Sequence, residues 1–581
     1  MSPTVALLVG IVSSLSFTGV CAGSTTSSPA SVQQQPRKLR STVAAEVDPS
    51  LQLAAALEGA LGAGHGIHEH QMMEIYAKLV PTWKSLPKNP SGKVNKRSVF
   101  YVVHRYFMQS YSINIIGLDS VAGNTSFADL LDINRFAPRY VQELLDGENL
   151  VDGYAMEDAV AMVVVIEHFI SNSGREILDH VYAKRKVEAR VSQETLAPVV
   201  ENFMIRWMLS SSPNVMRTME NEAERRMSTF EEWAAIVGHI SGAIQRFEHA
   251  GDASGRSGPG KWNPMDRRFS FEDTHAVVDG MVKSFGDFWN PVCSSVKEKL
   301  KEMDSGSTGR VSLSKFHKSA FGGEWRFGES TDYLRTLGAL DESSAWHGPR
   351  VIIPNYLQSA SNCIVSTSSY RVCCKNECED YMDALEAAVG GPLAEPEHLL
   401  ALVGEFAAEN DEGGQLPSSL RSQLMNIAEA NNGRVPLHGR LFAQWLHYAF
   451  PYECPFPHVV GTVESVTPEE FGTRSLASRA ELQINLKSEI PAEAALKNLS
   501  LVNGTGDADW MTWWSHEEEL LSERLHLTAP WERNVFQILK LALGAALALC
   551  SMLGARKRFS ESDVKKALPL GLSPEGKSHF V

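Results

Sequence analysis

Six cysteines carry the clearest chemistry in this chain, because thiols in an oxidising compartment form disulfides. The sequence holds eight cysteines in all, and two of them, Cys21 and Cys550, lie in apolar stretches near its ends. The remaining even number favours disulfides over a zinc site, since no compact second pair of metal ligands follows the cluster. We therefore expect disulfides, with the pairing left open, among Cys293, Cys363, Cys373, Cys374, Cys378 and Cys454.

One loop carries oxygen-bearing side chains at the spacing of a calcium site. A twelve-residue calcium loop has glycine at its sixth position, and Gly309 fits that place. Asp304, Thr308 and Ser312 then fall at the first, fifth and ninth positions, which supply ligands. The twelfth position requires a bidentate glutamate and here holds Lys315. Because a lysine replaces two ligand oxygens with a positive charge, we expect calcium to bind weakly at most.

The phrase around Gly309 recurs, and such recurrence indicates a repeated fold. It joins a glycine, a β-branched residue and an amphipathic helix. It reads GRVSLSKF from Gly309, GRVPLHGRLF from Gly433 and GKVNKRSVF from Gly92, with a weaker copy beginning at Ala189. In these features the chain resembles the EF-hand superfamily, which implies helix–loop–helix units. At the ligand positions it departs from that family, since the Gly433 loop has Ala428 in first place.

This resemblance and the apolar periodicity predict a mainly α fold of tandem EF-hand-like helical units. Acids open an apolar helix just after Tyr154, Phe269 and Leu393, which is typical of a helix N-terminus. Good short strand candidates occur only at residues 350–353 and 459–466. The predicted segments are helical unit 1 at 51–150, unit 2 at 151–250, a linker at 251–268, unit 3 with the cysteine-rich segment at 269–392, and unit 4 at 393–466.

Both ends of the chain carry targeting signals. Residues 1–22 are mostly apolar and end in small residues, as signal peptides do, and a disordered Ser/Thr-rich spacer is expected at 23–50. A juxtamembrane region at 467–534 leads to an apolar segment, 535–555, that is long enough to span a bilayer as one transmembrane helix. The basic residues that follow predict a cytoplasmic tail at 556–581.

These signals predict a single-pass type I membrane protein of the secretory pathway or cell surface. A plastid-type membrane is the alternative, because the spacer also fits a transit segment behind a signal peptide. The apolar segment has a second interpretation as a buried core helix, because Gln537 and Lys540 interrupt it. Glycosylation would fit the secretory compartment, and sequons lie at Asn124, Asn498 and Asn503.

Composition and motifs exclude some functions. The chain of 581 residues has a net charge of −15, which argues against a nucleic-acid partner, since such a partner requires a basic face. The sequence contains no HExxH, GxSxG, GxGxxG or CxxC motif, so no reaction is indicated by a local signature.

Three strings are similar to a family of uncharacterised secreted or membrane proteins of unicellular algae: SNCIVSTSSYRVCCKNECEDY, GRVPLHGRLFAQWLHYAFP and YECPFPHVVGT. The similarity extends over about residues 270–470 and implies a shared fold without an activity. We therefore expect a non-enzymatic ectodomain that acts in recognition or scaffolding with an unknown protein partner. A calcium-responsive sensor in the secretory lumen is one alternative. An enzyme with a dispersed site, placed at residues 363–378, is the other.

Overall fold

A computed structural model describes much of the unit that extends from Pro49 to Val581. The residues described are 69–118, 153–209, 232–253, 268–321, 326–343, 347–367, 369–409, 416–487 and 514–521.

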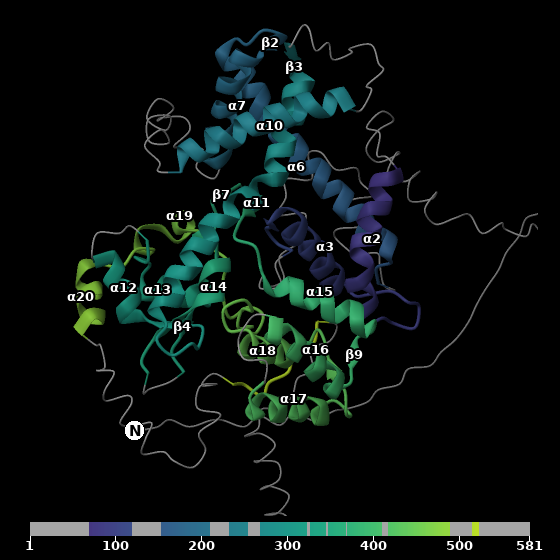
Figure 1. The fold of residues 1–581 in the computed structure, drawn as a ribbon, viewed down its shortest axis with the longest axis vertical. Helices are drawn as coiled ribbons and strands as arrows, with labels where there is room; N and C mark the ends of the chain where they lie inside the picture. The colour runs from purple at the N-terminus through teal and green to yellow at the C-terminus, as the bar shows by residue number, and fades with distance from the viewer. Residues whose placement is uncertain are drawn as a thin grey trace, which may run out of the picture. The chain divides into compact units, whose positions relative to one another are not determined.

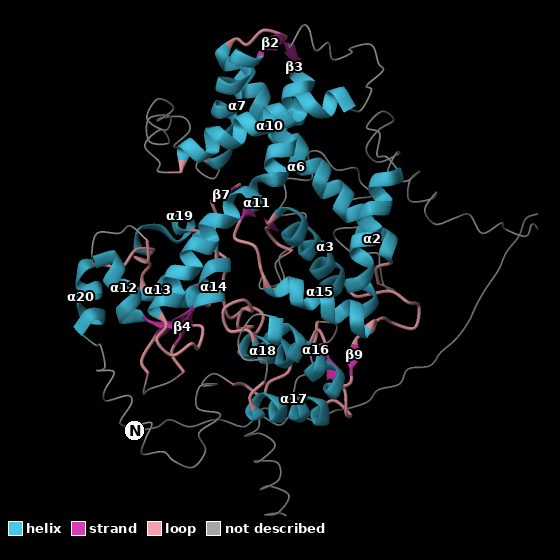
Figure 2. Cartoon of the chain, in the orientation of Figure 1, coloured by secondary structure: helices cyan, strands magenta, loops and turns pink. Residues whose placement is uncertain are grey.

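Helices dominate this part of the chain, and the prediction of a mainly α fold with few short strands is confirmed (Figures 1 and 2). The helices are α2 (Glu69–Ser85), α3 (Lys96–Tyr111), α6 (Met156–Arg185), α7 (Gln193–Met208), α10 (Trp233–Ala253), α11 (Phe271–Met303), α12 (Leu313–Phe321), α13 (Thr331–Thr336), α14 (Ile353–Gln358), α15 (Cys378–Val389), α16 (Pro396–Glu409), α17 (Ser418–Ala430), α18 (Arg440–Ala449), α19 (Pro468–Phe471) and α20 (Arg479–Lys487), with the 3-10 turns η2 (Ala360–Asn362) and η3 (Gly472–Arg474). The strands are β1 (Ile113–Ile115), β2 (Arg190–Ser192), β3 (Arg268–Ser270), β4 (Arg310–Ser312), β5 (Leu340–Asp341), β6 (Arg350–Ile352), β7 (Val365–Ser366), β8 (Tyr370–Val372), β9 (Leu393–Ala394) and β10 (Val435–Pro436).

Short antiparallel contacts join the loops between these helices, and the recurring phrase supplies one side of four of those described. The β-branched residue of the phrase is the buried centre of the contact, because a strand of two or three residues points few side chains inward. This explains why the valine recurs. The paired residues are Val94 with Tyr154, Val191 with Phe269, Val311 with Val351, and Val435 with Ala394.

Of the two predicted strands, one is confirmed and one is wrong. Residues 350–353 contain β6, which lies between β4 and β5. Residues 459–466 form turns and irregular chain. Their polar groups bond to helix α13 instead of a ladder: the backbone N–H of Glu464 donates to the Thr336 carbonyl (2.9 Å), and the Tyr333 hydroxyl donates to the Val466 carbonyl (2.8 Å).

The acidic openings of two of the three predicted helices act as N-terminal caps. At the start of α11, Ser270 Oγ accepts from the backbone N–H of Asp273 (3.2 Å), whose carboxylate accepts from the Ser270 N–H (2.9 Å). At the start of α6, the Asp158 carboxylate accepts from the Ala155 N–H (2.7 Å). These bonds satisfy donors that the first helical turn leaves free, so the helices begin close to the predicted positions.

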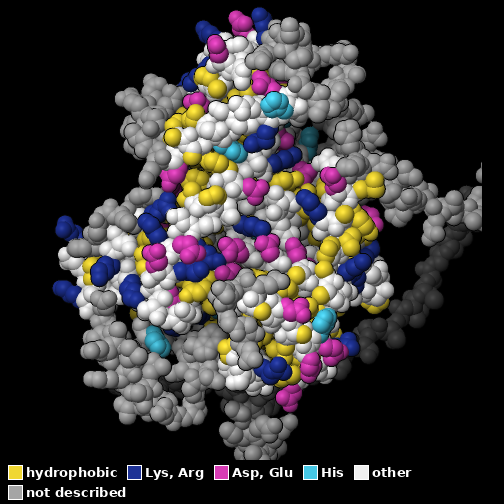
Figure 3. Space-filling view, viewed as in Figure 1, with side chains coloured by type: hydrophobic (Ala, Val, Ile, Leu, Met, Phe, Trp, Pro, Cys, Tyr) yellow, Lys and Arg dark blue, Asp and Glu magenta, His cyan; other side chains and the backbone are white. Residues whose placement is uncertain are grey.

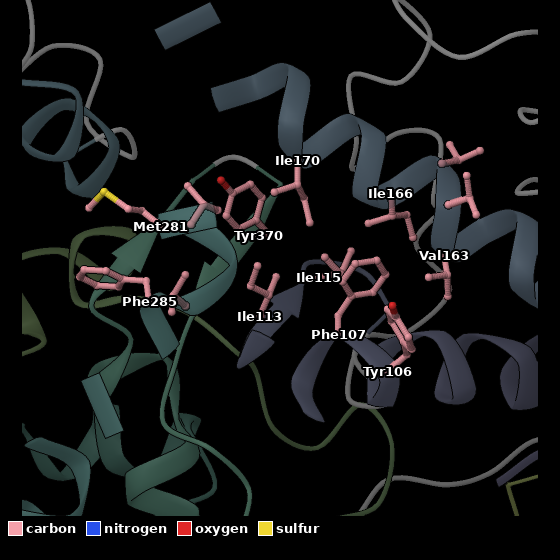
Figure 4. Close-up of a cluster of buried hydrophobic side chains, with 14 of the residues drawn as sticks. Tyr106, Phe107, Ile113, Ile115, Val163, Ile166, Ile170, Met281, Phe285 and Tyr370 are labelled. Atoms are coloured by element: carbon pink, nitrogen blue, oxygen red, sulfur yellow. The ribbon is translucent and has the colours of Figure 1, made fainter. Parts of the chain in front are cut away.

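The largest hydrophobic cluster spans predicted units 1 and 2 and part of unit 3. It contains buried residues of α2, α3, α6, α7, α10 and the first half of α11, together with β8. Figure 4 shows Ile113 and Ile115 of β1 in one cluster with Ile166 of α6 and Phe107 of α3. The helical units of the sequence prediction therefore share one core here.

Helix α11 connects this cluster to two others. Beyond Phe285, its residues Trp289 and Cys293 pack with Cys374 in a small cluster. Its last turns, with Val296 and Leu300, pack against α12 to α14 and the β4–β6–β5 sheet. A further cluster is formed mainly by α15 to α18.

On the face drawn in Figure 3, acidic and basic side chains lie next to one another across the middle. None of the described helices is long and apolar enough to cross a membrane. The predicted span at 535–555, the signal peptide at 1–22 and the spacer at 23–50 lie outside the described residues.

Candidate functional site

Asp304 follows α11 and organises the loop in which we predicted a calcium site. Its Oδ2 accepts hydrogen bonds from the backbone N–H groups of Thr308 (2.7 Å) and Gly309 (2.8 Å). Its Oδ1 accepts from the N–H of Gly306 (3.0 Å), and the Tyr452 hydroxyl donates to Oδ2 (3.2 Å). Both carboxylate oxygens therefore already serve donors of the protein, as an Asx-type turn residue does.

Lys315 closes the same loop from its other end. Its ammonium donates to the carbonyl of Met303 (3.0 Å) and to Ser305 Oγ (3.0 Å). Lys315, at the twelfth position, thus joins the end of the loop to its beginning and places a positive charge there. A second cation in this loop would be repelled by that ammonium, so Lys315 opposes calcium binding.

The other two predicted ligands also have partners in the protein. The Thr308 hydroxyl lies 3.5 Å from Asp304 Oδ1, so these two side chains meet. Ser312 turns to the start of the next helix, where its Oγ lies 3.1 Å from Ser314 Oγ and accepts from the Lys315 N–H (3.4 Å). Within the described segments, no group of three or more His, Cys, Asp or Glu side chains could hold a metal ion.

The Gly92 and Gly433 loops are closed by protein groups as well. Asn89 Oδ1 accepts from the Lys93 N–H (2.9 Å), and the Gly433 N–H donates to the Ala428 carbonyl (2.7 Å). Both glycines have a positive φ, +76° and +84°, which explains why glycine recurs there. The recurring phrase encodes a tight turn and a strand contact.

All six predicted disulfide cysteines are joined in the structure. Cys293 of α11 pairs with Cys374, and Cys363 pairs with Cys373 at the β7–β8 hairpin. Cys378, at the start of α15, pairs with Cys454, which follows α18. No free thiol remains among them to act as a nucleophile or a zinc ligand, so the cysteine-rich segment serves as a covalent tie.

This cysteine-rich segment also adds a strand to the first helical pair. Strand β8 pairs antiparallel with β1, with Val372 opposite Ile113, and with β7 on its other side. The Trp207 ring N–H donates to the Tyr370 hydroxyl (2.9 Å). Residues 363–378 therefore contact α7, β1, α11 and the segment after α18.

A serine, a histidine and a glutamate meet in the interior, where they superficially suggest catalysis. Ser85 Oγ lies 2.9 Å from His438 Nε2, and Glu386 Oε1 lies 3.3 Å from the same nitrogen. A serine nucleophile needs its carboxylate on the opposite ring nitrogen. Ser85 is fully buried and also donates to the Thr82 carbonyl (2.8 Å). The cluster is thus a packed polar network.

Burial sets the protonation of this network. Burial lowers the pKa of His438 to about 3, so its ring is neutral at pH 7. Burial also raises the pKa of Glu386, although the nearby Arg105 guanidinium opposes that change. Neutral imidazole next to the serine hydroxyl avoids a second buried positive charge beside Arg105.

Arg105 of α3 gathers three carboxylates of α15. Its side chain is 2% exposed and forms ion pairs with Glu379 (2.5 Å), Asp383 (2.7 Å) and Glu386 (2.5 Å). Sequence reasoning missed this cluster because the partners are far apart in the chain. The spacing of the three acids, however, places them on one face of a helix, which is a readable signal.

The predicted sequons at Asn124, Asn498 and Asn503 lie outside the described residues. Comparison with known proteins adds no relative: no family model, no curated protein and no solved structure matches this chain.

Proposed function

We propose that this chain is a type I membrane protein whose helical ectodomain acts in recognition or scaffolding without using calcium. The observation that carries the proposal is the closure of the Asp304 loop by its own N–H groups and by Lys315. A loop that already contains the positive charge of Lys315 gains little from binding a metal ion, so we assign it a structural role.

The distribution of covalent and hydrophobic ties supports a scaffold. Helix α11 contributes to three hydrophobic clusters, and two of the disulfides join the cysteine-rich segment to α11 and to the chain after α18. Such ties restrict relative motion of the helical pairs, and a rigid surface loses less entropy when a partner binds.

Calorimetric titration of the purified chain with calcium tests the proposal that the ectodomain does not use calcium. We expect no heat of binding at millimolar calcium. A saturable heat would instead favour a calcium-responsive sensor in the secretory lumen, because only an open coordination site would bind the ion.

Protease protection tests the membrane topology. A tag placed after residue 581 should be digested in sealed microsomes, and the ectodomain should be protected. Chemical cross-linking in the native membrane tests the scaffold role, since a scaffold should be recovered with a stoichiometric protein partner. Recovery of the chain alone in every membrane fraction would contradict that role.

A further inference from the structure

Residues 514–521, which we call the strap, lie across the start of α18 as a bound peptide would. A β-bridge joins Leu520 of the strap to Gly439, and the Arg440 N–H donates to the Glu519 carbonyl (3.0 Å). A peptide that adds to a strand edge binds through such main-chain bonds, which any extended segment can form. The residues that contact the strap form a groove, which consists of Arg97, Gly439, Arg440, Leu441, Gln444 and Val460.

Two consecutive acids of the strap occupy defined places in this groove. Glu518 is 6% exposed, and its Oε1 accepts from the Leu441 N–H (3.1 Å) at the start of α18. Glu519 Oε1 accepts from the Arg97 guanidinium of α3 (3.1 Å), and its Oε2 accepts from the Val460 N–H (3.3 Å). The N–H groups at a helix N-terminus favour a carboxylate, and so does an arginine. The groove is therefore complementary to two adjacent acids.

Arg440 is the groove residue that most requires an occupant. It is 7% exposed, and its guanidinium donates to Ser515 Oγ (3.2 Å) and to the Glu517 carbonyl. Among the described residues, the carboxylates that act on its charge all belong to the strap, at Glu517, Glu518 and Glu519. If the strap left and nothing replaced it, this cation would lose its acceptors and its counter-charges, which is costly for a buried group. Exchange for another acidic segment is thus more favourable than an empty groove.

The strap is attached to the protein in a way that permits such an exchange. Residues 488–513 separate it from α20, and at up to about 3.5 Å per residue they let the strap leave while that helix stays in place. Its apolar ends hold it, since Trp514 packs on the cluster of α15 to α18 and Leu521 on the largest cluster. A cavity of about 450 Å³ borders Arg440 and Ser515, so the strap does not fill the space beside it.

We propose that this groove binds an extended acidic peptide of a protein partner, and that the strap is the internal competitor of that peptide. The ligand carries two consecutive acids flanked by apolar residues, because these are the strap positions that the groove contacts. Binding of the partner exchanges one acidic segment for the other and releases the strap. The inference rests on the recognition role proposed above and names the class of partner.

A labelled peptide with the strap sequence, WSHEEELL, tests the groove on the purified full chain by fluorescence anisotropy. The natural chain should bind it weakly, because the tethered strap competes at an effective concentration in the millimolar range. A full chain with Glu518→Lys and Glu519→Lys has a weakened strap and should bind the peptide about tenfold or more tightly than the natural chain. The peptide WSHQQQLL should bind this variant about tenfold less tightly than WSHEEELL. Equal binding of the two peptides, or equal binding by the two chains, would overturn the proposal.

Arg97→Gln, added to the chain with the weakened strap, tests the groove side of the contact. It should reduce the affinity for WSHEEELL about tenfold, because it removes the cation that pairs with an acid. Arg175→Gln is the matched control, since the Arg175 side chain is 38% exposed, close to the 32% of Arg97, and pairs with Glu272 (2.9 Å) between α6 and α11. Equal affinities of these two variants would refute the assignment.

The natural chain keeps the proposal testable if the charge-reversed strap prevents folding. Millimolar WSHEEELL should accelerate hydrogen exchange of the backbone amides of residues 514–521, because the peptide replaces the strap. The same concentration of WSHQQQLL should leave their exchange rates nearly unchanged. Exchange that neither peptide alters would contradict the proposal.

Failure of this proposal and failure of the recognition role give different results. A partner recovered by cross-linking from a chain that does not bind the peptide would place recognition on another surface and overturn the groove alone. Peptide binding without any cross-linked partner would support the groove and contradict the recognition role. Dimers of the natural chain that the peptide disperses would identify the strap of a second copy as the occupant, which would overturn the choice of a different partner.

Discussion

Gly309 lies so close to the carbonyl group of Pro451 that any side chain on the glycine would overlap it. Gly309 belongs to the loop after α11, and Pro451 follows α18. The neighbouring Tyr452 strengthens the same contact through its hydroxyl, which donates to Asp304 (3.2 Å). The loop that looked like a calcium site is therefore an attachment point between two helix–loop–helix pairs.

Gly309→Ala should destabilise the protein more than Gly433→Ala. Both glycines have a positive φ, +70° and +84°, and a Cβ costs about 1 kcal/mol in that conformation. At Gly433 nothing lies within 4 Å of the added Cβ, whereas at Gly309 the Pro451 backbone must move. Overpacking adds about 1 to 3 kcal/mol. Thermal unfolding followed by circular dichroism should show the larger loss for Gly309→Ala, and equal losses would contradict the contact.

Lys315→Glu should create calcium sensitivity, which we propose the natural chain does not have. The substitution removes the ammonium that bridges Met303 and Ser305 and supplies the carboxylate that the twelfth loop position needs. With only Asp304 as a second acid, the Kd should be about 10⁻³ M or weaker. Lys315→Met serves as the control, because it removes the charge without adding a ligand. A calcium-dependent rise in melting temperature is expected for Lys315→Glu alone, and an identical response of all three proteins would refute the explanation.

Local features were predictable from the sequence, and contacts between distant segments were not. The acids at Asp158 and Asp273 indicated helix starts because capping is settled within four residues. The recurring valines indicated a repeated contact, although their partners were unknown. The even number of cysteines indicated disulfides. Their pairing was not predictable, because Cys293 and Cys374 are 81 residues apart and no local rule selects such a pair.

The strand expected at residues 459–466 shows that a local pattern can also predict an element that does not form. The segment is rich in valine, which is a signal of β propensity rather than of an available partner. It meets helix α13, which offers single polar groups rather than a strand. The charged cluster around Arg105 was also not predicted. Arg105 lies in α3, whereas its acidic partners lie far along the chain in α15, which begins at Cys378.

Arg105→Met should destabilise the fold strongly, and Arg335→Met should not. Each arginine pairs with more than one carboxylate, but the Arg105 side chain is 2% exposed and that of Arg335 is 49% exposed. Loss of Arg105 leaves the fully buried Glu386 without its counter-charge, which costs about 3 to 5 kcal/mol. An exposed pair contributes about 1 kcal/mol or less. Denaturant unfolding should separate the two variants, and similar midpoints would contradict the burial argument.

Acid should weaken the fold partly through His438. Its pKa is lowered from 6.5 to about 3 by burial, with the Arg105 charge adding to the effect. Between these values the unfolded chain binds a proton that the folded protein does not. Stability is therefore complete above about pH 6.5 and is lost as the pH falls, by about 1.4 kcal/mol per pH unit for this one group.

His438→Gln should remove the group that binds this proton in the unfolded chain. The slope of unfolding free energy against pH should become shallower by about one proton between pH 6 and pH 4. Above pH 7 the slopes of the variant and the natural protein should coincide, which is the internal control. A variant slope that stays the same below pH 6 would mean that His438 is protonated in the folded protein.

Removing the disulfide between Cys378 and Cys454 should destabilise the protein more than removing the one between Cys363 and Cys373. The first closes a chain segment of 76 residues and the second one of 10 residues. The entropy of loop closure predicts losses of about 4 to 5 kcal/mol and about 3 kcal/mol, respectively, when both cysteines of a pair become serine. The variant that lacks the disulfide between Cys363 and Cys373 still has the disulfide between Cys293 and Cys374, and the chain segment that this disulfide closes includes the smaller loop. Melting temperatures of the two double variants, measured without reductant, provide the test. A greater loss from the short loop would mean that the β7–β8 hairpin depends on its disulfide for the pairing of β8 with β1, and that native contacts outweigh chain entropy at this site.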